Sequence, residues 1–204
     1  MRRLLSILVI SVMVLVLTSC VEDGTLRVKN NTSAMIWFDV DSGVTNYLNA
    51  YSSWNRNYSS DRWVDIEYSG DHVFSSSAEV LVENGRTTSL EISATGGAIS
   101  LLNNSGITIY SVYLSPSSSS SWGSDQLTGV LNPNQTTLWT VSAGSWDIRI
   151  KDIAGNNYYI YDRYINLDHT LSVSFTYSQK TEQKVKHEGI DPNLSDACRI
   201  EKKN

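Results

Sequence analysis

The feature that most constrains the fold is the alternation of apolar and polar residues over two long stretches, residues 25–93 and 98–177. Asn, Gly, Asp and Ser divide both stretches into short runs, and neither stretch shows a convincing apolar stripe at helical spacing. A period of two is typical of strands, and the polar interruptions are typical of turns. The sequence therefore predicts an all-β protein. The expected strands are residues 26–28, 34–40, 63–68, 79–82 and 89–92, then 99–102, 107–114, 137–141, 146–150, 158–161 and 171–177.

The two stretches also resemble each other. Residues 24–33 match residues 97–106, since each begins with Gly, contains an Asn-Asn pair and leads into an apolar run. Further on, the sequence WVDIE at 63–67 lies against WDIR at 146–149, and the offset grows from 73 to about 82. We interpret this pattern as a duplicated unit of 70 to 80 residues.

Short repeats with six or seven strands fit a β-sandwich. We therefore predict two tandem, related, small β-sandwich units of the Ig-like or C2-like kind, over residues 24–96 and 97–177. A single sandwich completed by strands from both halves is the alternative, because a unit of this size gives a thin basis for an independent core.

The first residues have the composition of an export signal. Arg2 and Arg3 precede an apolar stretch at 4–17, which is shorter than the roughly 20 residues that a membrane-spanning helix needs. The sequence Leu-Thr-Ser-Cys at 17–20 resembles the lipobox of bacterial lipoproteins. An ordinary signal peptide that happens to contain a cysteine, or a single membrane anchor, is the alternative.

The lipobox resemblance implies removal of residues 1–19, a diacylglycerol thioether on Cys20 and acylation of the new amino group, with residues 20–23 as a short linker. Several fatty chains anchor a protein stably, whereas one holds it only marginally. In that family an Asp after the cysteine retains the protein in the inner membrane. Val21 stands here instead, so we expect the outer membrane if the organism has two.

The charge of the chain argues against nucleic-acid binding. The formal net charge is −5 and becomes −7 once Arg2 and Arg3 are removed, whereas nucleic-acid binders need a surplus of Lys and Arg. An acidic body is not drawn to an anionic membrane, so the lipid would have to tether it. We expect residues 178–204 to form a flexible polar tail, in which Cys198 is a free thiol or, alternatively, pairs between molecules.

The second half resembles an uncharacterised domain of secreted bacterial proteins. The residues that carry the resemblance are Ser115-Pro116, the serine run at 117–121, Trp122-Gly-Ser-Asp125-Gln-Leu127, the turn at 130–135, the sequence WDIR at 146–149 and the Asp-x-x-Gly hairpin at 152–155. Asn134 replaces the usual turn Gly, Trp146 replaces the usual Tyr, and the cysteines of some relatives are missing. The resemblance implies a fold and a compartment, and no activity.

Few residues suggest catalysis or metal binding. His72 and His169 lie in no recognisable catalytic motif, and we expect both to be solvated turn or strand-start residues. Carboxylates at 39, 41, 125, 147 and 152 are candidate Ca²⁺ ligands, but Asp-Ser-Gly at 41–43 is also an ordinary turn. We predict no catalytic residue, no metal and no cofactor.

Aromatic residues are the remaining candidates for a ligand surface. Tyr47, Tyr51, Trp54 and Tyr58 cluster in a polar segment, and Trp122 follows the serine run. Exposed Trp and Tyr rings can stack on sugars or contact peptides, although core and cross-strand packing explains such residues equally. We therefore name Trp54, Trp122 and Asp125 as weak ligand-binding candidates.

Together these patterns predict a lipid-anchored envelope protein that acts as a non-enzymatic binding or structural module. Its partners would be the membrane, through Cys20, and an envelope protein or glycan, with no nucleic acid. The alternatives are an envelope hydrolase whose site is assembled in space, or a Ca²⁺-dependent glycan or adhesion module.

Overall fold

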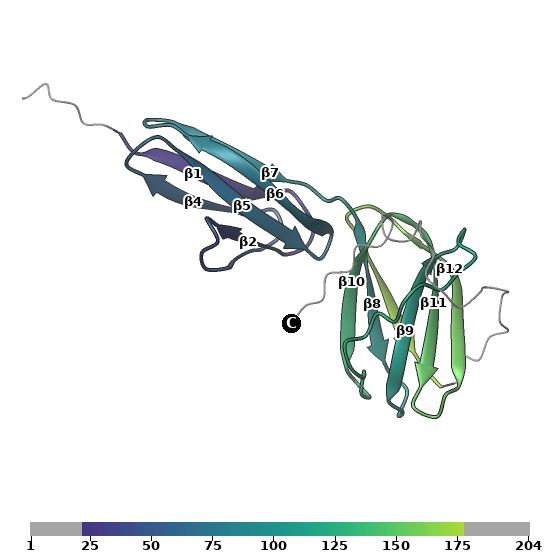
Figure 1. Cartoon of the computed structure of the whole chain (residues 1–204). Coiled ribbons are helices and arrows are strands. Elements are labelled where there is room, and N and C mark those ends of the chain that lie inside the picture. Colours follow the sequence, from purple (N-terminus) through teal and green to yellow (C-terminus); the bar gives the residue numbers. More distant parts are fainter. Residues whose placement is uncertain (1–21, 178–204) are drawn as a thin grey trace, which may run out of the picture.

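The structure, a computed structural model, describes residues 22–177, which form thirteen strands and no helix (Figure 1). The prediction of an all-β protein is therefore confirmed. None of the described residues forms a helix long and apolar enough to cross a membrane. The predictions for the signal peptide, Cys20, Cys198 and the tail concern residues outside the described range.

The first half folds into a sandwich of two sheets. Its strands are β1 (Gly24–Asn30), β2 (Ile36–Val40), β3 (Asn46–Leu48), β4 (Ser53–Tyr58), β5 (Arg62–Gly70), β6 (Val73–Val82) and β7 (Thr87–Ile92). One sheet has the order β4-β1-β7 and the other has the order β3-β2-β5-β6. The inward faces bury one apolar cluster that includes Leu26, Phe38 and Ile66.

The second half folds in the same way. Its strands are β8 (Gly97–Asn103), β9 (Ile109–Pro116), β10 (Thr136–Val141), β11 (Gly144–Asp152), β12 (Asn157–Ile165) and β13 (Thr170–Phe175). The sheets have the orders β10-β8-β13 and β12-β11-β9, and they enclose a core that includes Leu101, Trp146 and Ile148. Every described strand pairing stays within one half. Two tandem sandwiches are therefore confirmed, and the alternative of a single shared sandwich is wrong.

The strand pairings repeat between the two units. In the first unit, β1 lies between the antiparallel β4 and the parallel β7. In the second unit, β8 lies between the antiparallel β10 and the parallel β13. The central strand of the other sheet, β5 or β11, pairs antiparallel on both sides in each unit. The units are thus two copies of one topology.

Asn30 and Asn103 hold the first loop of each unit with corresponding hydrogen bonds. Each side chain is fully buried, and its Nδ2 donates to the carbonyl four residues on, that of Ala34 or Ile107, at 2.8 Å in both units. Its Oδ1 accepts from the backbone N and the hydroxyl of Thr32 or Ser105. A buried amide here satisfies loop groups that the strands leave unpaired. The Asn-Asn pairs in the sequence therefore mark a structural repeat.

Two strands lie where we expected none. β3 and β4 come from the aromatic segment after residue 44, whose polar residues conceal the alternation. β4 is an edge strand of the β4-β1-β7 sheet, so only its inward-facing residues need to be apolar. Trp54 and Tyr58 fill these positions against the core, while Asn55, Arg56 and Asn57 are exposed.

Candidate functional site

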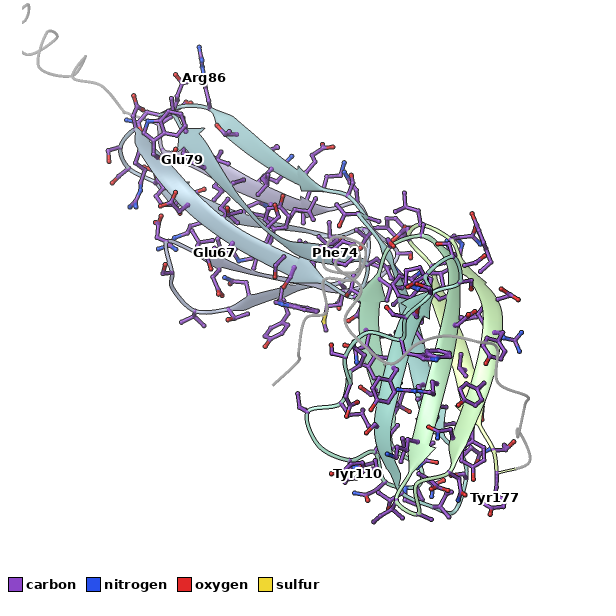
Figure 2. All side chains as sticks on the ribbon, turned by 45° about the vertical axis from the view of Figure 1, so that its right-hand side comes forward. Glu67, Phe74, Glu79, Arg86, Tyr110 and Tyr177 are labelled. Carbon is purple, nitrogen blue, oxygen red and sulfur yellow. The ribbon has the colours of Figure 1, made fainter. Side chains whose placement is uncertain are left out.

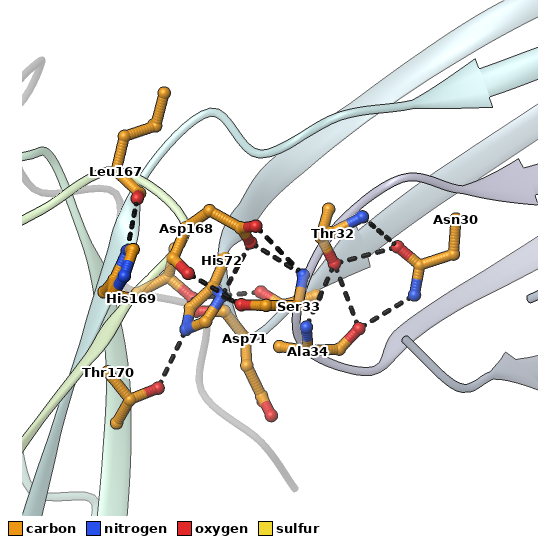
Figure 3. A network of polar contacts seen from close by, with 12 residues as sticks. Asn30, Thr32, Ser33, Ala34, Asp71, His72, Leu167, Asp168, His169 and Thr170 are labelled. Atoms are coloured by element: carbon orange, nitrogen blue, oxygen red, sulfur yellow. Dashed lines mark hydrogen bonds and ion pairs between the residues drawn. The ribbon is translucent and has the colours of Figure 1, made fainter. Parts of the chain in front are cut away.

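A polar network joins the two sandwiches (Figure 3). Ser33 comes from the β1–β2 loop and His72 from the turn before β6, while Asp168 and Thr170 come from the turn and strand start after β12. The His72 Nδ1 lies 3.0 Å from the Asp168 Oδ1, and its Nε2 lies 2.8 Å from the Thr170 Oγ1. The backbone N of Ser33 also donates to the Asp168 carboxylate.

Backbone contacts tighten this junction. The His72 carbonyl accepts hydrogen bonds from the N–H groups of Thr95 and Gly96, both at 3.0 Å, in the short connection between β7 and β8. The Thr140 hydroxyl lies 3.1 Å from the carbonyl oxygens of Gly70 and Asp71 in the first unit. A Cβ on Gly96 would lie only 2.5 Å from the carbonyl oxygen of Val141. The connection is therefore packed closely against the second unit.

His72 is only 3% exposed, so the expectation that it is a solvated residue was wrong. Its burial arises because three segments far apart in the sequence meet at the junction, and no local pattern signals that meeting. The second histidine, His169, is exposed as expected, and its Nδ1 contacts the carbonyl of Leu167.

The order Thr170, His72, Asp168 places a hydroxyl and a carboxylate on opposite nitrogens of one imidazole. Because a carboxylate only accepts, the contact between Nδ1 and Asp168 requires a proton on Nδ1, while Nε2 faces the hydroxyl of Thr170. Hydrolases use the same order to activate a nucleophile. Here Ser33 also lies 3.3 Å from Nδ1 and donates to the backbone oxygen of Asp168 at 2.6 Å, so the contacts bind one unit to the other.

The candidate Trp122 is fully buried. It lies against the outer face of the β12-β11-β9 sheet, where its ring centroid is 5.7 Å from that of Tyr159 and 6.2 Å from that of Tyr161. The Arg149 guanidinium lies 5.4 Å from the Trp122 ring and 3.9 Å from the ring of Tyr113. Trp122 thus closes the loop between β9 and β10 over this face, and its ring is covered by protein.

The other two ligand candidates also have structural contacts. The Asp125 Oδ1 accepts from the backbone N of Val112 at 3.0 Å and from that of Leu127 at 3.1 Å, which fixes the loop beside β9. Trp54 is half-buried and meets Phe38 edge to face at 5.3 Å. The structure does not bring Trp54 near the other two candidates, because it belongs to the first unit and they belong to the second.

The proposed calcium ligands do not gather. Asp147 accepts from the Ser117 hydroxyl at 2.6 Å and from the backbone N of Asp162 at 2.8 Å. Burial raises the pKa of Asp152, but hydrogen bonds from Asn156 and Tyr158 outweigh burial and leave that pKa below its ordinary value. Within residues 22–177, no group of three His, Cys, Asp or Glu side chains is placed to hold a metal ion.

The outer face of the β3-β2-β5-β6 sheet carries a surface that the sequence analysis did not identify. A hollow of about 280 Å³ lies on it, lined in part by Asp65, Glu67 and Glu79. Trp63 on the same strand is 58% exposed. The signal was present as alternate charged positions in residues 63–67, but the sequence alone did not show which side of the strand would stay open.

No protein-family model and no curated protein match the chain. Among solved structures, the Bacillus anthracis TIE protein is 8% identical with a TM-score of 0.27, and the match covers 78% of this chain and 34% of that one. A DUF3823 family protein from Bacteroides ovatus is 10% identical with a TM-score of 0.25, covering 71% of this chain and 99% of that one. GBS52, the minor pilin of Streptococcus agalactiae, is 9% identical with a TM-score of 0.26, covering 80% and 99%. The chain spans about a third of the TIE protein, and similarities this low assign no function.

Proposed function

We propose that this chain is a lipid-anchored protein of the bacterial cell envelope that works by binding or by structural display rather than by catalysis. The observation that carries the proposal is the lipobox-like sequence at 17–20, directly ahead of a folded body. Only Val21, Glu22 and Asp23 separate Cys20 from the first strand. A lipid on Cys20 would therefore hold the first sandwich close to the bilayer.

The arrangement of the units supports display away from a membrane. β1 begins at the end of the first unit that lies opposite the second unit, so a chain anchored ahead of β1 would present the second unit outward (Figure 1). The contacts of Ser33, His72 and Thr140 join the units at the other end. Two sandwiches joined in this way form an elongated body suited to a spacer or a binding module.

The polar contacts of the junction support a non-enzymatic role. The His72 ring contacts Asp168 and Thr170 across the junction, and its contact with Ser33 lies within the first unit. A hydrolase needs space for its substrate beside the reacting hydroxyl. The hollow on the β5–β6 face lies apart from these residues, since none of its lining residues belongs to the junction.

Metabolic labelling with an alkyne fatty acid tests the anchor. We expect the wild-type chain to incorporate the label and to fractionate with membranes, and Cys20→Ala to lose the label. Cys198→Ala is the matched control and should be labelled like the wild type. In a two-membrane organism, Val21→Asp should shift the protein toward the inner membrane. Equal labelling of wild type and Cys20→Ala would refute the anchor.

A further inference from the structure

The outer face of the β3-β2-β5-β6 sheet carries two pairs of like charges. Asp39 on β2 lies directly opposite Glu67 on β5, and Asp65 on β5 lies directly opposite Glu79 on β6. Like charges in directly opposite positions destabilise a sheet. We call these four residues, together with Trp37 and Trp63, the acidic face. The labels of Glu67 and Glu79 in Figure 2 locate it along the first unit.

The described contacts leave the charge of the acidic face uncompensated. The ion pairs of Lys and Arg in the first unit join Lys29 to Glu91, Arg62 to Asp41 and Arg86 to Glu83, and among residues 22–177 no ion pair reaches the four carboxylates. In addition, the Oδ1 atom of Asp39 is buried and has no hydrogen-bond partner. Residues 22–96 contain 11 acidic and 5 basic side chains, so the acidic face lies in the more acidic unit.

The surface has room for a ligand. The hollow of about 280 Å³ is lined by Asp65, Glu67 and Glu79, and the small residues Ser42 and Ser77 form other parts of its lining. Trp63 lies two residues before Asp65 on the same face of β5, and Trp37 lies opposite Ser69 toward the other end. Aromatic rings therefore flank the row of carboxylates.

The second unit shows what covers the equivalent face. The cross-strand row of Asp39, Glu67 and Ser77 corresponds to the row of Tyr113, Arg149 and Tyr159, because both rows run across the same three strands of the repeated sheet. In the second unit the loop after β9 folds over this row, and the Arg149 guanidinium lies between the rings of Tyr113 and Trp122. In the first unit the corresponding segment instead forms β3 at the edge of the sheet, which leaves the face open.

We propose that the acidic face binds an extended segment of a partner protein that carries Lys or Arg at alternate positions. Carboxylates on one strand face recur about every 7 Å, which is also the spacing of alternate side chains in an extended peptide. Trp63, and Trp37 at the other end, could stack on the cations. A single metal ion fits less well, since the described residues include no ligand group of three.

The inference deepens the proposed function by naming the class of partner, and it rests on that function only in assuming that the chain acts by binding. Its test uses purified full-length protein in detergent, with no membrane. A failure of peptide binding would therefore leave lipid anchoring untouched. Conversely, a failure of the labelling experiment would not affect the proposal that the acidic face binds a peptide.

The probe is a fluorescein-labelled peptide in which Lys alternates with Thr, measured by fluorescence anisotropy. The acidic-face variant combines Asp65→Asn, Glu67→Gln and Glu79→Gln. The matched control removes the same charge away from the face through Glu22→Gln, Asp23→Asn and Glu91→Gln, which are all exposed. We expect the acidic-face variant to lose about tenfold or more in affinity, and the control to change by about twofold at most.

Two further measurements sharpen the test. Trp63→Ala should weaken peptide binding about threefold, because it removes a ring that can stack on the cations. The melting temperature of the acidic-face variant should equal or exceed that of wild type, since like-charge repulsion is relieved. A loss of peptide affinity in that variant would then result from the removed carboxylates and not from unfolding.

Three outcomes would overturn the proposal. Unchanged peptide affinity in the acidic-face variant would show that the carboxylates take no part. An equal loss in both triple variants would show attraction to net charge alone. Dimerisation of the wild type that the acidic-face variant abolishes, measured by analytical ultracentrifugation, would make a second copy the occupant.

Discussion

The two sandwiches share one order of strands but differ in what lies on the outer face of one sheet. In the second unit the β9–β10 loop covers that face, and Trp122 is fully buried beneath it. In the first unit the same face is open, and Trp63 on it is 58% exposed. The repeated core is therefore compatible with either arrangement, because both units bury the same inward-facing positions between their sheets.

The charged side chains on each outer face differ according to whether a loop covers that face. The central strands contain Asp65-Ile66-Glu67 in one unit and Asp147-Ile148-Arg149 in the other. The Ile is buried in both, whereas the flanking charges are exposed in the first unit and buried in the second. A charge under a loop needs hydrogen bonds or ring contacts, as Asp147 has, while an open charge needs only water.

The largest contrast should come from the two tryptophans on these faces. Trp122→Ala should lower the free energy of unfolding of the second unit by about 3–5 kcal/mol, because it removes a fully buried ring and leaves a cavity. Trp63→Ala should change it by about 0.5 kcal/mol or less, since its ring faces solvent. Urea denaturation measures both. Equal losses would show that the two faces are not covered differently.

A smaller effect, equal in the two units, should follow from the loop asparagines. Asn30→Ala and Asn103→Ala each remove a buried amide that bonds to several loop groups. Each should lower the free energy of unfolding of its own unit by about 2–3 kcal/mol, because loop carbonyls are left unpaired. Denaturation followed by NMR would assign each loss to a unit. A large loss in only one unit would contradict the same structural role for the two asparagines.

The smallest effect concerns the junction. His72→Ala removes the contacts to Asp168 and Thr170 and should weaken the coupling of the two units by about 1–2 kcal/mol. Calorimetry should then show the unfolding transitions of the units moving apart. His169→Ala is the control, since that ring is exposed and contacts only the nearby Leu167 carbonyl. Identical calorimetric traces for the His72 and His169 variants would contradict a role for His72 in coupling the two units.

The sequence revealed the fold through features that act locally. Alternation located eleven of the thirteen described strands, because burying one face of a strand requires an apolar residue at every second position. The Asn-Asn pairs located the repeat, because each buried Asn bonds to loop groups close to it in the sequence. β4 escaped notice because an edge strand keeps its exposed positions polar. Asn134, which stands at the usual Gly of the resembled turn ahead of β10, has a φ of 65° and fits that turn.

The candidate surfaces depended on contacts between distant segments, which local patterns do not report. The burial of His72 needs a loop from the first unit and a turn near residue 168 to meet. Trp122 lies beneath its own loop only because β11 and β12 supply Arg149, Tyr159 and Tyr161. The acidic face likewise emerges only when the register pairs β2, β5 and β6.

In the function proposed for this protein, a lipid on Cys20 holds the two-sandwich body at the cell envelope. Mass spectrometry of the N-terminal peptide from the native protein tests it most directly. We expect a chain that begins at Cys20 and carries a diacylglycerol thioether, with an acylated amino group. A free thiol at Cys20, or a chain that still contains residues 1–19, would contradict it.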